Sequence, residues 1–471
     1  MGNANGKKES DNLYTSEELR FLETAYRSAS GGALEKLTSD RLVESWSQTI
    51  ERSLAESTAQ FLFIPQKPGQ QCINIPLKRF GEPYYIMERG SIEMKMQFLL
   101  SSLNRNPSDN FNIKQLEQYI HSVIKSYVHL ETTSKGSSIK EWQDLGFITT
   151  ERSACTFAKG LMRNLSKDLE HTMPNETLER WLHVTPQFLQ LWREVFVQLY
   201  TRHGGSNKRS LVKEIEICIL PQLCDAPQNS HYRPIIELPH VLYINAQLPR
   251  EMRHKWRFLF SSKIHGESFS TMLGKMLDKG PTLFFIEDED QYIFGGYAPE
   301  SWALKPQFAG NDSSLLYTLS PAMRCFTSTG YNDHYQYLNL NQQTMPNGLV
   351  SHYLICSNYI LINAIFIYLQ GMGGQFEFWG LWLDCMFGEG QSVESCTTYG
   401  DYVQLSKRKQ FKIRNMEVWA VGDLPVKDNE EGGGEGQKRS VLDGNLEDRA
   451  MLEIAGKQMH SDGLREPGMD D

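Results

Sequence analysis

The spacing of apolar residues changes near Leu238, and this change limits what the chain can fold into. Before Leu238, apolar side chains follow the period of an amphipathic helix, as they do over 179–200. After it, short apolar runs alternate with turn residues, which is typical of strands. We therefore predict an α+β fold, with a helical N-terminal domain over 15–237 and a strand-rich domain over 238–422.

The helical part is predicted to begin where Thr15 to Glu18 resemble a capped helix start. A single long helix is predicted over 179–200, and Gly204 and Gly205 end it. Between Met94 and His129 the pattern is helix, loop and helix, and it resembles a degenerate EF-hand.

The EF-hand-like loop lacks the usual calcium ligands. Counting back from Glu117 as its twelfth position places Phe111 at the sixth, where a sharp turn needs glycine. Amides and one hydroxyl occupy the ligand positions before Glu117: Asn106, Ser108, Asn110 and Asn112. A calcium site needs several anionic oxygens, so helix packing is the favoured interpretation and calcium binding is the alternative.

In the strand-rich part, 282–287 and 292–297 form a predicted hairpin around a solvated acidic turn. Two further strands are predicted over 378–387 and 416–421. A helix is predicted over 269–277, before the hairpin, and a glycine–proline pair stops it.

Composition excludes several classes of function. The net charge of −9 argues against a nucleic-acid binder and against membrane attachment by bulk electrostatics. The eight cysteines form no CxxC pair, so neither a metal site nor a redox motif is expected, and no cofactor is implied. The absence of an apolar signal segment at the N-terminus indicates free thiols in a reducing, cytosolic setting.

The N-terminal residues 1–14 are predicted to be disordered and to carry a lipid on Gly2. Small and polar residues follow Gly2, as N-myristoylation requires, although Gly6 replaces the preferred serine or threonine. One myristoyl chain binds membranes only marginally, so a second contact through protein partners is expected. The alternative is an unmodified tail.

The C-terminal region is predicted to contain an acidic, glycine-rich linker over 423–439 and a helix over 440–456. Four apolar residues fall on one face of this helix: Leu442, Leu446, Ala450 and Ile454. A helix this short needs a surface to lie on, either on a partner or on its own chain. The length of the linker favours a partner.

Side chains that suit catalysis are present without a defined motif. Cys325, Cys385 and Cys396 could support thiol chemistry, and His265 and His334 could act as bases. A reactive thiol needs a nearby cation or helix start; Arg324 adjoins Cys325, but neighbours in a strand point to opposite faces. Structural thiols are therefore favoured, as are turn or capping roles for the histidines.

The stretch from Arg257 to Gly422 resembles the TLDc-domain family. The matching segments, in family order, are LFSS (259–262), HG (265–266), GPTL (280–283), FGGYA (294–298), GYND (330–333), GMGG (371–374), GLWLD (380–384) and MEVWAVG (416–422). Within the family, the chain is most similar to the mTOR-associated, lysosomal type. An apolar stretch over 350–370 departs from the family pattern and is predicted to be an atypical insert.

The resemblance implies a β-sandwich core with flanking helices. It also implies contact with the V-ATPase and a role in mTOR signalling, with oxidation resistance as a looser family theme. We therefore expect a non-enzymatic adaptor, held through Gly2 to the cytosolic face of the lysosomal membrane. The alternative is a thiol-dependent antioxidant enzyme that uses Cys325 or Cys396.

Overall fold

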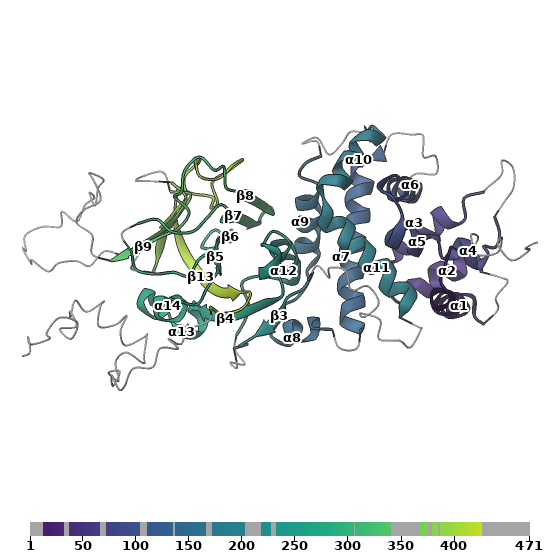
Figure 1. The fold of residues 1–471 in the computed structure, drawn as a ribbon, viewed down its shortest axis with the longest axis horizontal. Coiled ribbons are helices and arrows are strands. Elements are labelled where there is room, and N and C mark those ends of the chain that lie inside the picture. Colours follow the sequence, from purple (N-terminus) through teal and green to yellow (C-terminus); the bar gives the residue numbers. More distant parts are fainter. Residues whose placement is uncertain are drawn as a thin grey trace, which may run out of the picture. The chain divides into compact units, whose positions relative to one another are not determined.

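The computed structural model describes residues 13–32, 37–65, 72–103, 111–134, 137–165, 172–202, 218–227, 232–305, 307–340, 368–374, 379–384 and 387–425. They divide between two compact units (Figure 1). The helical unit draws on Met1–Asp144, Ile148–Ile219 and Glu237–Ala246, and the sheet unit on Leu145–Phe147, Leu220–Ile236 and Gln247–Asp471. Within the described ranges, no helix combines the length and the apolar character that crossing a membrane requires.

The helical unit contains twelve described helices and two short strands. They are α1 (Ser16–Ser30), α2 (Ser39–Trp46), α3 (Arg52–Leu62), α4 (Leu77–Phe80), α5 (Glu82–Arg89), α6 (Ile92–Leu103), β1 (Phe111–Asn112), α7 (Ile113–Thr133), α8 (Ile139–Asp144), α9 (Glu151–Leu161), β2 (Thr172–Met173), α10 (Asn175–Val184), α11 (Pro186–Thr201) and α12 (Leu238–Asn245).

Aromatic side chains hold the centre of this unit together. Trp192 of α11 stacks on Phe98 of α6, with ring centroids 5.2 Å apart, and its Nε1 donates to the Tyr119 hydroxyl of α7 at 3.0 Å. At the start of the unit, Thr15 and Glu18 form the predicted capping box, because each side chain accepts from the backbone N–H of the other. The helical N-terminal region of the predicted α+β fold is confirmed.

The single helix predicted over 179–200 is wrong, because the chain breaks it into α10 and α11. The break falls at Thr185, whose φ of −123° and ψ of 61° are not helical. Pro186 follows and begins α11. Proline has no N–H to continue the preceding helix and disfavours helical geometry in the residue before it.

The described residues of the sheet unit form eleven strands, two helices and a short 3-10 turn. They are β3 (Gln222–Cys224), η1 (Arg250–Met252), β4 (Lys255–Ser261), α13 (Ser262–His265), α14 (Phe269–Met276), β5 (Thr282–Asp288), β6 (Ile293–Ala298), β7 (Leu315–Ser320), β8 (Arg324–Thr327), β9 (Tyr337–Leu340), β10 (Tyr368–Met372), β11 (Leu381–Asp384), β12 (Glu389–Gln391) and β13 (Gln410–Val421).

Hydrogen bonds join the strands in the order β8-β7-β6-β5-β13-β12-β11-β10-β9, and β4 pairs with β13 and β3. All of these pairs are antiparallel except β3 with β4. The long strand β13 pairs with β12 at its start and lies between β4 and β5 further on. The predicted α+β fold is confirmed, as are the hairpin of β5 and β6 and the helix at α14.

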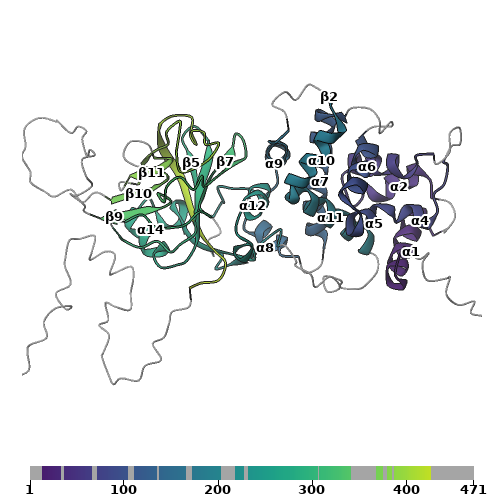
Figure 2. The same cartoon turned by 45° about the horizontal axis from the view of Figure 1, so that its top comes forward.

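The sheet folds into two layers around one core. Strands β9 to β11 and strands β5 and β7 lie on opposite sides of the unit (Figure 2). Phe284 of β5 and Leu316 of β7 share a buried cluster with Met372 of β10 and Leu381 of β11. The layers meet closely at Gly296, where a Cβ would lie 2.6 Å from the Met372 sulfur. A larger side chain there would separate the layers.

The C-terminal end of the predicted insert forms part of the sheet. Tyr368–Gln370, its last three residues, belong to β10, which pairs with β9 and β11. Their backbone pairs with both neighbouring strands, although in the sequence they directly follow the isoleucine-rich stretch. The remainder of the insert, 350–367, lies outside the described residues.

Candidate functional site

Glu417 of β13 is a buried carboxyl with a strongly raised pKa. Its side chain is fully buried, and its Oε1 accepts from the backbone N–H of Ile235 at 3.2 Å. Its Oε2 lies 3.4 Å from the Trp419 indole nitrogen, which donates to it. Burial raises the pKa of Glu417 to about 7, because a buried carboxylate loses its hydration. The carboxyl thus fastens 232–236 to β13.

A serine and a histidine lie beside this carboxyl. Ser261 of β4 is the register partner of Glu417 and is fully buried. Nδ1 of His265 accepts from the Ser261 backbone N–H at 3.1 Å, and its ring stacks on Phe260. Burial leaves no access for a substrate to the Ser261 hydroxyl. The capping role predicted for His265 therefore fits the geometry, and the three residues do not form a catalytic triad.

His334 occupies the predicted turn. Its backbone N–H donates to Oδ1 of Asn332 at 3.2 Å, and its ring packs on Phe308 with centroids 4.3 Å apart. Burial lowers the pKa of His334, which favours the neutral imidazole. The interactions of this histidine hold the turn.

The cysteines that were weighed for thiol chemistry do not form a cluster in the described residues. Cys325 lies on β8, and Cys396 lies in the segment after β12. Burial raises the pKa of the Cys396 thiol, so less of the nucleophilic thiolate is present at neutral pH. Cys385 lies outside the described residues.

The acidic turn between β5 and β6 is only partly solvated, which corrects the expectation of a solvated tip. Asp288 is 1% exposed and accepts from the Tyr292 backbone N–H at 2.8 Å and from the Ser406 hydroxyl at 2.6 Å. Asp290 forms an ion pair with Arg408 at 3.1 Å. The carboxylates are used to close the turn rather than gathered around a cation.

In the helical unit, two helix–loop–helix segments are joined through β1 and β2. These strands pair antiparallel, with Phe111 opposite Met173 and Asn112 opposite Thr172. This pairing is typical of two adjacent EF-hands. The second helix–loop–helix segment, from α9 to α10, was not predicted from the sequence. Its sequence signal is a polar stretch over 166–171 between two amphipathic segments.

Two residues of the EF-hand-like loop have partners within the protein. Oδ1 of Asn112 accepts from the Lys114 backbone N–H at 2.8 Å and caps α7. Glu117 lies 3.7 Å from the Lys159 ammonium. Asn106, Ser108 and Asn110 lie outside the described residues. The geometry at Asn112 and Glu117 serves helix packing.

The predicted lipidation site and the predicted docking helix lie outside the described residues. These are Gly2 and the four apolar positions Leu442, Leu446, Ala450 and Ile454. Their roles stay predictions.

Comparison with known proteins supports the resemblance. A model of the TLDc domain matches residues 229–422. "MTOR-associated protein MEAK7" of Xenopus laevis is 35% identical over 416 residues, which cover 85% of this chain and 82% of the relative. The protein of that name from Danio rerio is 33% identical over 458 residues, covering 96% and 93%. The one from Homo sapiens is 43% identical over 258 residues, covering 54% and 51%.

The matches extend beyond the sheet unit, because the Danio rerio protein aligns with nearly the whole chain, helical unit included. They indicate no enzyme family. The chain therefore belongs to the TLDc-domain family and is homologous to the mTOR-associated protein MEAK7.

Proposed function

We propose that this chain is a non-enzymatic adaptor that associates with mTOR signalling components at the cytosolic face of the lysosomal membrane. The observation that carries the proposal is the similarity over 96% of the chain to a relative whose name states mTOR association. Contact with the V-ATPase follows from the TLDc resemblance and is part of the same proposal. Gly2 supplies the lipid anchor, and the helix over 440–456 supplies a second docking element.

The described polar groups support a binding role rather than catalysis. His265 and His334 hold turns, Asp288 closes a hairpin, and Glu417 fastens a neighbouring segment. These side chains form their hydrogen bonds with other residues of the same domain. What remains for function is the outer surface of the domain.

A pull-down from lysosomal membranes tests the proposal. The bait is the full chain, and V-ATPase subunits and mTOR are detected in the eluate. We expect both to be retained, and we expect Leu446→Asp with Ile454→Asp to lose the V-ATPase while the melting temperature stays unchanged. Asn445→Asp with Leu452→Asp adds the same two carboxylates on the opposite side of the predicted helix and serves as the matched control.

Two outcomes contradict the proposal. If neither partner is retained by the full chain, the adaptor role is wrong. If the double aspartate variant keeps V-ATPase binding but melts at a lower temperature, the helix packs on its own chain instead.

The alternative, a thiol-dependent antioxidant enzyme, is less favoured at Cys396 because burial raises the pKa of its thiol. It makes a separate prediction. Purified protein would consume peroxide with turnover, and Cys325→Ser or Cys396→Ser would abolish it. Peroxide consumption that is unchanged in both variants excludes this chemistry at these thiols.

A further inference from the structure

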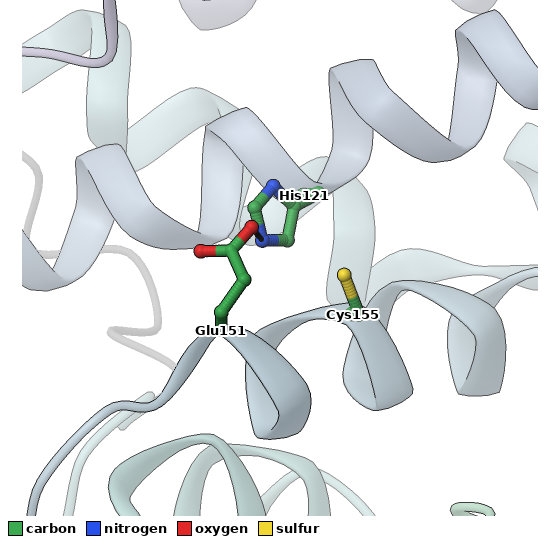
Figure 3. A group of neighbouring side chains, drawn as sticks. All are labelled: His121, Glu151 and Cys155. Atoms are coloured by element: carbon green, nitrogen blue, oxygen red, sulfur yellow. Dashed lines mark ion pairs between the residues drawn. The ribbon is translucent and has the colours of Figure 1, made fainter.

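Three side chains that suit a metal ion converge between α7 and α9 (Figure 3). His121 projects from α7 toward α9, and Glu151 and Cys155 project from α9 toward it. The His121 Nε2 and Glu151 Oε1 atoms are 3.0 Å apart, and the ligand atoms of all three residues lie within 4.8 Å of one another. We propose that His121, Glu151 and Cys155 bind a zinc ion.

Local structure explains why the three residues meet. Thr150 caps the start of α9 and makes Glu151 its first residue. Cys155 lies four positions later, which is about one helical turn, so both side chains point from the same face. His121 lies in the middle of α7, which packs against α9. The site thus rests on two rigid helices rather than on loops.

The imidazole of His121 faces the Glu151 carboxylate. Its Nε2 lies 3.0 Å from Oε1 of Glu151, so the two ligand atoms already point toward each other. A metal ion that enters here would replace this imidazole–carboxylate contact with one bond to each atom. Imidazole coordinates a metal through a neutral ring nitrogen.

The thiol of Cys155 exchanges its proton for the metal. A cysteine binds zinc as the thiolate, whereas the free side chain is a thiol at neutral pH. When Zn²⁺ binds, the S–H bond breaks, a zinc–sulfur bond forms, and the proton passes to solvent. No oxidation or reduction takes place.

The ligand set selects zinc over calcium or magnesium. Thiolate, imidazole and carboxylate together suit Zn²⁺, whereas calcium and magnesium prefer oxygen ligands only. In a tetrahedral zinc site the ligand atoms are about 3.3–3.8 Å apart, given bond lengths of about 2.0–2.3 Å. The three ligand atoms, which lie within 4.8 Å of one another, would have to approach by about 1 Å to reach that spacing. Three protein ligands leave a fourth position for water.

Lys125 would compete with the metal ion for the Glu151 carboxylate. Its ammonium lies 3.2 Å from Oε2 of Glu151 and also 3.3 Å from Oε1 of Glu51. Because Glu51 can retain the ammonium, a metal can take over the Glu151 carboxylate without leaving Lys125 unpaired. Removing the lysine charge should therefore strengthen metal binding.

The full-length protein, reduced and freed of metal, tests the proposal by titration with Co²⁺ as a coloured substitute for Zn²⁺. We expect a thiolate-to-cobalt absorption band that saturates at one equivalent and disappears on addition of Zn²⁺. Cys155→Ala should abolish the band, and His121→Gln should weaken binding more than about tenfold. Cys72→Ala and His129→Gln, the latter on the same helix, are the matched controls and should bind as the parent does.

If Cys155→Ala and the parent give the same band, the proposal is overturned. Circular dichroism checks that each variant is folded. Should Cys155→Ala fail to fold, Glu151→Gln and Lys125→Met decide, because the first should weaken Co²⁺ binding and the second should tighten it. Equal affinity in both of these variants also overturns the proposal.

Discussion

Replacing Glu417 by glutamine removes a charge from the core of the sheet unit while keeping the size of the side chain. The carboxyl is fully buried, and its two oxygens accept from Ile235 and Trp419. Glutamine retains one carbonyl oxygen for the Ile235 N–H. The substitution therefore tests what ionisation of this group costs the fold.

The magnitude follows from the pKa. Burial raises the pKa of Glu417 from 4.5 to about 7 in the folded state. At 1.36 kcal/mol for each pKa unit, this difference corresponds to about 3 kcal/mol. Below pH 4.5 the carboxyl is protonated in both states and costs nothing. As the pH rises, the unfolded state ionises first, so stability falls and the full cost is present above pH 7.

The assay is urea unfolding of the parent and of Glu417→Gln at pH 5 and at pH 8. Other groups titrate over this range, so the quantity of interest is the difference between the two proteins at each pH. We expect glutamine to gain up to about 3 kcal/mol relative to the parent between pH 5 and pH 8. Glu287→Gln, a half-buried carboxyl on β5 that contacts Asn415, is the control.

A pH-independent difference between the two proteins would refute the reasoning. In that case the carboxyl does not change its ionisation in this range, and its role is only to accept hydrogen bonds. If Glu287→Gln shows the same pH-dependent difference in stability from the parent, the effect is not specific to the buried carboxyl of Glu417.

Three further predictions concern the N-terminus, the EF-hand-like segment and the insert. Gly2→Ala should release the protein from membranes, because it removes the myristoyl acceptor, and equal membrane fractions for mutant and parent would exclude the anchor. Residues 94–129 should fold without calcium, and calorimetry that detects micromolar calcium binding to the protein would contradict this. Deleting 350–367, which spares β10, should raise soluble yield and melting temperature, since the apolar stretch has strong β-propensity; a lower melting temperature would mean that it is packed.

The sequence predicted elements that carry strong local signals. The capping box at Thr15 and the hairpin of β5 and β6 depend on residues near one another in the chain. Both could therefore be predicted from short sequence patterns. The break at Thr185 also had a local signal, Pro186, but the apolar pattern continues through it.

Features that depend on distant residues were not predicted. The strand over 416–421 was predicted, but its burial on both faces was not. This burial arises because Ile235 and Phe147 contact the side that carries Glu417 and Trp419. The grouping of His121 with Glu151 and Cys155 has no motif spacing, since it arises from the packing of α7 against α9. Periodicity does not specify which helix packs against which.

The short ladder between β1 and β2 has a consequence for how the helical unit unfolds. Backbone pairing holds Phe111 and Asn112 to Met173 and Thr172. If one helix–loop–helix segment unfolds, the backbone groups of the other segment lose their partners at this ladder. We therefore expect the two segments to open together, and amide hydrogen exchange at these four residues should report a common opening free energy.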